Sequence, residues 1–117
     1  MGLDMYLKDE NDKEVAYWRK ANQIHKWFKN NCGYENDDTD KLVKVSREQL
    51  KQLRSICILV NADHSKAEEL LPTEEGFFFG STDYDEYYYD DLENTIEQLT
   101  ALIENRTIQK FFYHAWW

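Results

Sequence analysis

Only two cysteines occur among the 117 residues, Cys32 and Cys57, and they do not form a C-x-x-C pair. This excludes a disulfide framework and the zinc and redox motifs that are built on paired cysteines. The first residues, MGLDMYLKDENDK, lack the cationic start and long apolar core of a signal peptide. The sequence also lacks an apolar run of membrane-spanning length. We therefore expect a soluble, cytoplasmic protein with free thiols.

Basic residues are also scarce, because 14 Lys and Arg stand against 23 Asp and Glu, which gives a net charge of −9. This balance disfavours direct binding to nucleic acid, whose phosphates require Lys and Arg. It is compatible with a basic protein partner, including one whose nucleic-acid-binding groove the acidic chain occupies. Solubility is the alternative explanation for the same charge.

The sequence lacks the common catalytic signatures. It contains no GxxxxGK[ST], GxGxxG, GxSxG or HExxH pattern, and no nucleophile stands beside a recognisable base. The histidine and glutamate at positions 64 and 68 are four residues apart, but no second histidine completes a metal motif. We therefore expect a protein that is not an enzyme.

What the sequence does contain is a globular composition, with 42% hydrophobic and 15% aromatic residues. Residues 2–8 and 41–45 alternate in polarity, as strands do, and residues 108–117 are rich in β-prone aromatics. Ser46 and Gln49 form a capping box before a helix that extends to about residue 61. Shorter and longer helices are predicted at 63–71 and from 81 or 82 to 106, with a strand or tight turn at 76–80. These elements predict a single α+β domain over residues 1–117, with three to four short strands and three to four helices.

A further helix is predicted over residues 14–29, EVAYWRKANQIHKWFK. At about 100° per residue its apolar side chains fall in one stripe, which also contains His25, with Asn22 at the edge. Asn11 or Asp12 is the expected cap of this helix. A buried imidazole and amide need hydrogen-bond partners, and we expect these in the first strand and the last helix.

The same reasoning indicates a candidate metal site. On the last predicted helix Asp85 falls near the buried arc, and Asp4 lies on the polar face of the first strand. Asp4, Asn22, His25 and Asp85 are suitable ligands for one divalent ion, most plausibly zinc. The alternative is a buried hydrogen-bond network between His25 and Asp85 without metal. Arg19 lies beside this face and is expected to pair with an acid of the last helix.

The segment DYDEYYYDDLE, residues 83–93, is the strongest anomaly in composition, since ten of its eleven residues are Asp, Glu or Tyr. Acids in the first turns of a helix favour it through the helix dipole. The number of acids and tyrosines exceeds that need, and tyrosine is favoured at protein interfaces. We expect a partner-binding surface here, or else only a solvated face. Its residues are Asp83, Glu86, Tyr87, Asp90, Asp91 and Glu93, supported by the loop acids Glu35, Asp37, Asp38 and Asp40.

Three stretches resemble a family of small proteins encoded by phages and prophages. They are GLDMYL at the start, EVAYWRKANQIHKWF, and LLPTEEGFFFGSTDYDEYYYDDL. The resemblance implies a phage-borne protein in the cytoplasm of a bacterial host. Small acidic phage proteins include inhibitors of host defence, among them anti-CRISPR proteins that bind Cas9, and some of those hold a structural zinc.

The sequence thus leads to one primary hypothesis and one alternative. The primary hypothesis is an acidic inhibitor that binds a basic host protein, most plausibly a CRISPR nuclease, in a one-to-one complex. It would block loading of DNA or a movement that the nuclease needs. The alternative is a metal-dependent enzyme or small-ligand-binding protein centred on His25, Asp85 and Asp4.

Overall fold

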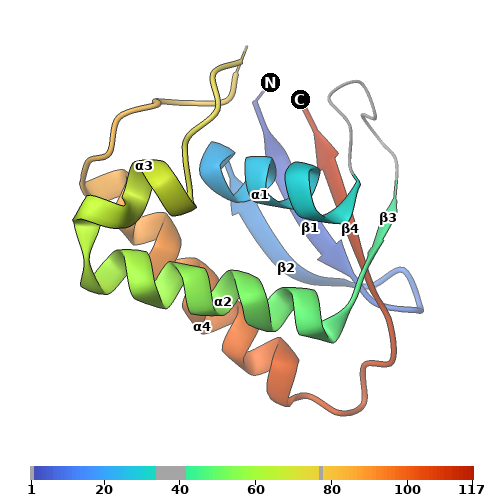
Figure 1. The fold of residues 1–117 in the computed structure, drawn as a ribbon. Coiled ribbons are helices and arrows are strands. Elements are labelled where there is room, and N and C mark those ends of the chain that lie inside the picture. Colours follow the sequence, from blue (N-terminus) through green and yellow to red (C-terminus); the bar gives the residue numbers. More distant parts are fainter. Residues whose placement is uncertain (1, 34–41, 77) are drawn as a thin grey trace.

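The computed structural model describes residues 2–33, 42–76 and 78–117. The elements in chain order are β1 (Asp4–Lys8), β2 (Glu14–Arg19), α1 (Asn22–Cys32), β3 (Val43–Val45), α2 (Arg47–Ala62), the 3-10 helix η1 (His64–Lys66), α3 (Ala67–Leu70), α4 (Glu86–Glu104) and β4 (Phe111–Trp116). In this part of the chain four antiparallel strands form one sheet, and α1 and α2 lie in front of it in Figure 1. The predicted α+β class is confirmed. The loop acids Glu35, Asp37, Asp38 and Asp40 lie outside the described residues.

Residues 14–29 do not form one helix, and this prediction was wrong for the first half of the segment. Glu14–Arg19 is strand β2, and α1 begins only at Asn22. The polar residues between β1 and β2 close a hairpin instead of capping a helix, with the Asp9 amide donating to the Lys13 carbonyl at 2.9 Å. Val15, Tyr17 and Trp18 favour strands, and antiparallel pairing with β1 places Tyr17 beside Tyr6 and Trp18 beside Met5.

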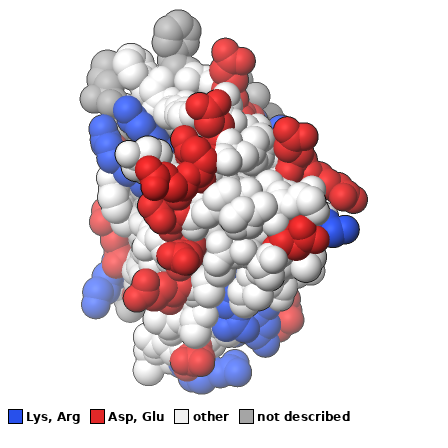
Figure 2. Space-filling model, turned by 90° about the vertical axis from the view of Figure 1, so that its left-hand side faces the viewer, with Lys and Arg blue, Asp and Glu red and all other residues white. Residues whose placement is uncertain are grey.

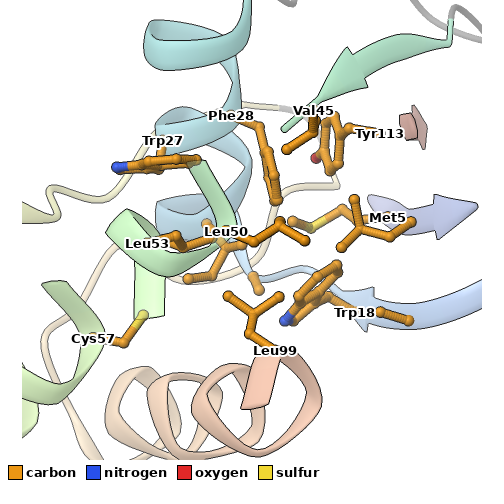
Figure 3. Packing of buried hydrophobic residues seen from close by; sticks show 14 of the residues in the cluster. Met5, Trp18, Trp27, Phe28, Val45, Leu50, Leu53, Cys57, Leu99 and Tyr113 are labelled. Carbon is orange, nitrogen blue, oxygen red and sulfur yellow. The ribbon is translucent and has the colours of Figure 1, made fainter. Parts of the chain in front are cut away.

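The strand order β2-β1-β4-β3 gives the sheet two different faces. Side chains on one face pack against the helices and form the core. In Figure 3 Met5, Trp18 and Tyr113 of the strands meet side chains of α1, α2 and α4. The Trp18 indole donates to Thr95 Oγ1 at 2.9 Å, which satisfies the one polar atom of this large buried ring. The opposite face carries Tyr6, Tyr17 and the other alternating residues.

Helix α2 begins as predicted. Ser46 Oγ accepts from the Gln49 amide, and the Gln49 side chain accepts from the Ser46 amide, which completes the capping box. Helix α4 begins at Glu86, later than the predicted start at 81 or 82. The run at 76–80 was predicted as a strand or a tight turn, and its residue 77 lies outside the described residues. Around it the Phe79 amide donates to the Gly76 carbonyl at 3.1 Å, as in a turn.

Helix α4 also covers the outer edge of the sheet at β2. Gln98 Nε2 donates to the Tyr17 carbonyl at 2.9 Å, and Gln98 Oε1 accepts from the Tyr17 amide at 3.0 Å. A side-chain amide thus occupies backbone groups that an exposed edge strand would offer to another chain. Among the described residues, none of the helices is both long and apolar enough to cross a membrane.

Candidate functional site

The junction between β2 and α1 forms one wall of a pocket. Lys20 has a φ of 55°, in the left-handed region, and its amide donates to the Leu3 carbonyl at 2.7 Å. The chain passes Gly80 closely here, because a Cβ on that residue would lie 3.1 Å from the Cβ of Lys20. Gly80 itself has a φ of 87°. A side chain at position 80 is therefore disfavoured by both space and backbone conformation.

Asn22 fixes the loop that carries Gly80. Its Nδ2 donates to the carbonyls of Phe79 at 3.0 Å and Ser81 at 2.9 Å, and its Oδ1 accepts from the Glu74 amide at 3.0 Å. The side chain is buried, and these bonds satisfy both ends of its amide. The chain at Glu74, Phe79 and Ser81 is thereby fastened to the first turn of α1.

The start of α4 forms the opposite wall. Asp85 is the N-cap of this helix, and its Oδ1 accepts from the amides of Tyr87 at 3.1 Å and Tyr88 at 3.2 Å. The Tyr88 hydroxyl donates to the Leu71 carbonyl at 2.7 Å, which ties the helix start to the end of α3. This arrangement directs the acids of α4 toward the β2–α1 junction.

Between these walls lies a pocket with a volume of about 360 Å³. It is lined by Arg19, Lys20, Gln23, Gly80, Ser81, Asp83, Asp85, Tyr87, Tyr88, Asp90 and Asp91. Four carboxylates thus face two basic side chains across one opening. A negative pocket of this kind favours a cationic group, and the basic wall restricts its approach.

Asp91 is a partly buried carboxylate of this pocket. Burial raises the pKa of its carboxyl to about 6, a hydrogen bond from Gln23 lowers it, and the charges of Asp90 and Asp85 raise it. Gln23 Nε2 donates to Asp91 Oδ2 at 3.4 Å and to the Tyr88 carbonyl at 3.3 Å. The folded chain therefore holds a carboxylate in an environment that disfavours its charge.

Replacing Asp91 by asparagine should stabilise the free protein at pH 7, because the amide carries no charge to desolvate. We expect a gain of about 1 kcal/mol in the free energy of unfolding, after allowance for solvent screening. A raised carboxyl pKa makes stability fall as pH rises between about 4 and 6, so the gain should disappear below pH 4. Thermal melts at pH 3.5 and 7 measure it. Glu104→Gln, at an exposed position of α4 outside the pocket, is the control, and an equal gain there would contradict the assignment to Asp91.

Most of the predicted partner-binding residues meet at this pocket. Asp83, Tyr87, Asp90 and Asp91 line it, whereas Glu86 and Glu93 are exposed on α4 outside it. Tyr87 is 70% exposed, the highest value among the large hydrophobic residues at the described surface. Figure 2 shows acidic side chains in a band down this side of the molecule, with basic side chains at its margins.

The four predicted metal ligands do not meet in this way. Asp4 Oδ1 accepts from the Tyr17 hydroxyl at 2.6 Å and from Arg19 at 2.9 Å, on the face of the sheet away from the helices. His25 lies on the helical face, where its Nδ1 is 2.6 Å from the Tyr113 hydroxyl. Within the described ranges, no group of three or more His, Cys, Asp and Glu side chains could hold a metal ion. The divalent ion stays a prediction.

Three details of that prediction were wrong. Asp85 was predicted to point from the last helix into the core. It instead lies at the N-cap of α4, where its side chain accepts from backbone amides. His25 and Asn22 are buried as expected, but the hydrogen bonds that the described residues show for them go to Tyr113 of β4 and to the loop before α4. Arg19 pairs with Asp4 instead of with an acid of α4.

Sequence reasoning missed the basic and neutral half of the pocket, namely Lys20, Gln23, Gly80 and Ser81. Glycine and serine directly before an acidic helix start were a usable signal, since small residues let a loop approach another backbone closely. The sequence contains no indication of the positive φ of Lys20, because lysine rarely adopts the left-handed conformation.

A second and larger hollow, of about 410 Å³, lies between α1 and α2. Its lining includes Trp27, Ile56, Glu48 and Lys51, so its one acid and one base balance. We place the candidate site at the acidic pocket because charge, exposed tyrosine and tightly fixed backbone coincide only there among the described residues. Comparison of the chain with protein-family models, curated proteins and solved structures finds no match.

Proposed function

We propose that this chain acts by binding a basic protein partner in a one-to-one complex, through the acidic pocket and the exposed acids beside it. The observation that carries the proposal is the convergence of Asp83, Asp85, Asp90 and Asp91 on one opening, with Tyr87 at its rim. A lysine or arginine of the partner would enter the pocket, and the tyrosine ring would supply contact area.

The half-buried carboxylate of Asp91 supports this mechanism. A cationic group placed beside it would offset the burial and the neighbouring charges that raise its pKa. Binding to a basic partner should therefore weaken as pH falls below about 6, where Asp91 takes up a proton.

A basic groove that binds nucleic acid would fit such a surface. The groove binds a dense row of negative charge, and the acidic surface supplies one. The resemblance to small phage proteins makes a CRISPR nuclease such as Cas9 the first partner to test. Occupation of the groove by this chain would block the loading of DNA without any catalytic step.

The alternative centred on His25, Asp85 and Asp4 gains no support from the contacts of those residues. His25 and Asp4 lie on opposite faces of the sheet, and Asp85 caps α4. We therefore do not propose a metal-dependent reaction.

Charge reversal tests the proposal directly. Changing Asp83, Glu86 and Asp90 to lysine should weaken partner binding at least tenfold and reduce its dependence on salt, because these exposed acids surround the opening. The melting temperature should change little, since exposed charges contribute little to stability. The measurement is capture of proteins from a bacterial lysate, and then calorimetric titration with the captured partner or with purified Cas9 bound to guide RNA.

The matched control reverses Glu48, Glu69 and Glu104, three exposed acids that do not line the pocket. It has the same change in net charge and should retain the partner. If the two triple variants bind equally well, total charge and not this surface determines binding, and the proposed site is wrong.

A further inference from the structure

The face of the sheet away from the helices carries aromatic rings in a regular arrangement. Cross-strand pairing places Tyr6 beside Tyr17 on β2 and His114 on β4. The ring centres of Tyr6 and Tyr17 are 5.3 Å apart, and those of Tyr6 and His114 are 5.7 Å apart. Tyr17 and Trp116 remain 43% and 52% exposed. Exposed aromatic surface of this kind on a sheet commonly marks an interaction site.

The charges that β1 and β2 place on this face are balanced and ordered, unlike those of the whole chain, and β3 adds one exposed base, Lys44, beside Phe112. Asp4, Glu14, Lys8 and Arg19 all act on the Tyr6 hydroxyl, two acids and two bases. Strands β1 and β2 each carry opposite charges at their two ends: β1 runs from Asp4 to Lys8, and β2 runs from Glu14 to Arg19.

This order makes the face complementary to itself. A two-fold axis that lies between two such faces, perpendicular to the strands, brings each end of a strand over the opposite end in the second copy. Arg19 then faces Glu14, and Asp4 faces Lys8. At the same time Trp116 faces Phe112, because these residues pair with Asp4 and Lys8 across the sheet. Tyr6, Tyr17 and His114, in the middle row, face their own counterparts.

We propose that the face formed by Asp4, Tyr6, Lys8, Glu14, Tyr17, Arg19, Phe112, His114 and Trp116 binds a second copy of this chain, as two sheets packed face to face. Other occupants fit less well. A nucleic acid needs a continuous row of cations, but on β1 and β2 each cation lies beside an acid, Lys8 beside Asp12 at 3.2 Å and Arg19 beside Asp4 at 2.9 Å. A basic protein needs an excess of acids, which this face lacks.

The size of the face sets the strength of the dimer. The three strands that carry these residues have five or six residues each, so at about 3.3 Å per residue and about 4.8 Å between strands they cover roughly 250 Å² in plan. A standard stable interface buries about 800 Å² per partner. The dimer should therefore be weak, populated at high micromolar concentration, and it leaves the acidic pocket outside the interface apart from Arg19.

Sedimentation equilibrium from about 10 μM to about 0.5 mM tests the proposal in the range where weak interfaces dissociate. The average mass of the wild type should rise from that of a monomer toward that of a dimer. Trp116→Asp should raise the dissociation constant at least tenfold, because it places two unpaired carboxylates against the Phe112 rings. Tyr87→Asp, which changes an equally prominent aromatic residue away from this face, should leave the dissociation constant unchanged.

A second variant tests the orientation. Glu14→Arg places arginine against Arg19 of the other copy and should also weaken the dimer, whereas Glu104→Arg, at an exposed position on α4, should not. Because Glu14 is exposed at the start of an edge strand, this variant should fold even if Trp116→Asp does not. A wild type that stays monomeric to 0.5 mM would overturn the proposal, and so would a dimer that neither variant weakens.

Discussion

Replacing Arg47 by alanine should lower the free energy of unfolding by about 3–5 kcal/mol, a large part of the stability of a domain of this size. This one guanidinium donates to four backbone carbonyls. Nη1 is 2.9 Å from the Leu102 oxygen and 2.5 Å from that of Ile103, and Nη2 is 3.2 Å from the Asn105 oxygen and 2.8 Å from that of Ile108.

The effect should be large because these carbonyls are at the end of α4 and in the loop that leads to β4. The last carbonyls of a helix have no partner within the helix. Arg47 therefore caps the end of α4 and at the same time holds the following loop against it. The guanidinium also lies 5.1 Å from the centre of the Phe111 ring. Arg47→Lys should recover little of the loss, since a single ammonium cannot reproduce the planar fork.

Urea unfolding at equilibrium measures this change. Arg54, about two turns after Arg47 in α2, is the matched control. Its guanidinium makes one long hydrogen bond, to Thr100 Oγ1 at 3.4 Å. Arg54→Ala should cost less than about 1 kcal/mol. If both variants lose the same small amount, Arg47 does not hold the end of α4 in solution.

Replacing His25 by alanine should cost about 3 kcal/mol. The imidazole is fully buried, so its removal leaves a cavity and breaks the contact with the Tyr113 hydroxyl 2.6 Å away. The rings of Phe79 and Trp117 lie against it, with centres 5.5 Å and 5.4 Å away. His64→Ala, at an exposed position, is the control and should have a small effect.

The pH dependence of the wild type should carry the signature of the same histidine. Burial, with a smaller contribution from Lys29, lowers the pKa of His25 to about 4. Between about pH 6.5 and 4 the His25 imidazole therefore binds a proton in the unfolded chain but stays neutral in the folded chain. The stability that the buried neutral His25 contributes is lost as pH falls through this interval. The difference in melting temperature between wild type and His25→Ala should shrink over that interval.

A chelator distinguishes the two interpretations of His25 that the sequence left open. A hydrogen-bond network needs no ion, so excess EDTA should leave the melting temperature unchanged while His25→Ala still lowers it. A fall in melting temperature with EDTA, together with about one metal per chain by elemental analysis, would favour the predicted ion.

Local signals explain the parts of the fold that the sequence predicted. The capping box of Ser46 and Gln49 depends only on neighbouring residues, so it located the start of α2 correctly. The alternation of Leu3, Met5 and Leu7 likewise identified β1 and its buried face. Neither signal requires knowledge of what lies across the fold.

The failure at residues 14–19 has the opposite cause. Tyr17 and Trp18 fit a helical stripe together with Ile24 and Phe28, but hairpin pairing with β1 separates them onto opposite faces of the sheet. A short apolar segment fits either period, and tertiary pairing decides between them. The β-prone composition of EVAYWR is the sequence signal that favours the strand.

The candidate site was half predictable for a similar reason. The acids of α4 are conspicuous in composition, and Asp83, Tyr87, Asp90 and Asp91 could be named from the sequence. Their convergence with Lys20 depends on the bonds of Asn22 across more than fifty residues, which no local pattern contains. The sequence therefore indicated the acidic wall and omitted the basic one.

Hydrogen–deuterium exchange of the complex with the captured partner tests the central claim most directly. If the partner occupies the acidic pocket, amides in residues 80–93 and at the β2–α1 junction should exchange more slowly in the complex than in the free protein. Exchange in β3 and in α2, which do not contribute to this pocket, should not change. Protection confined to the open face of the sheet or to α2, with residues 80–93 unaffected, would contradict the proposed function.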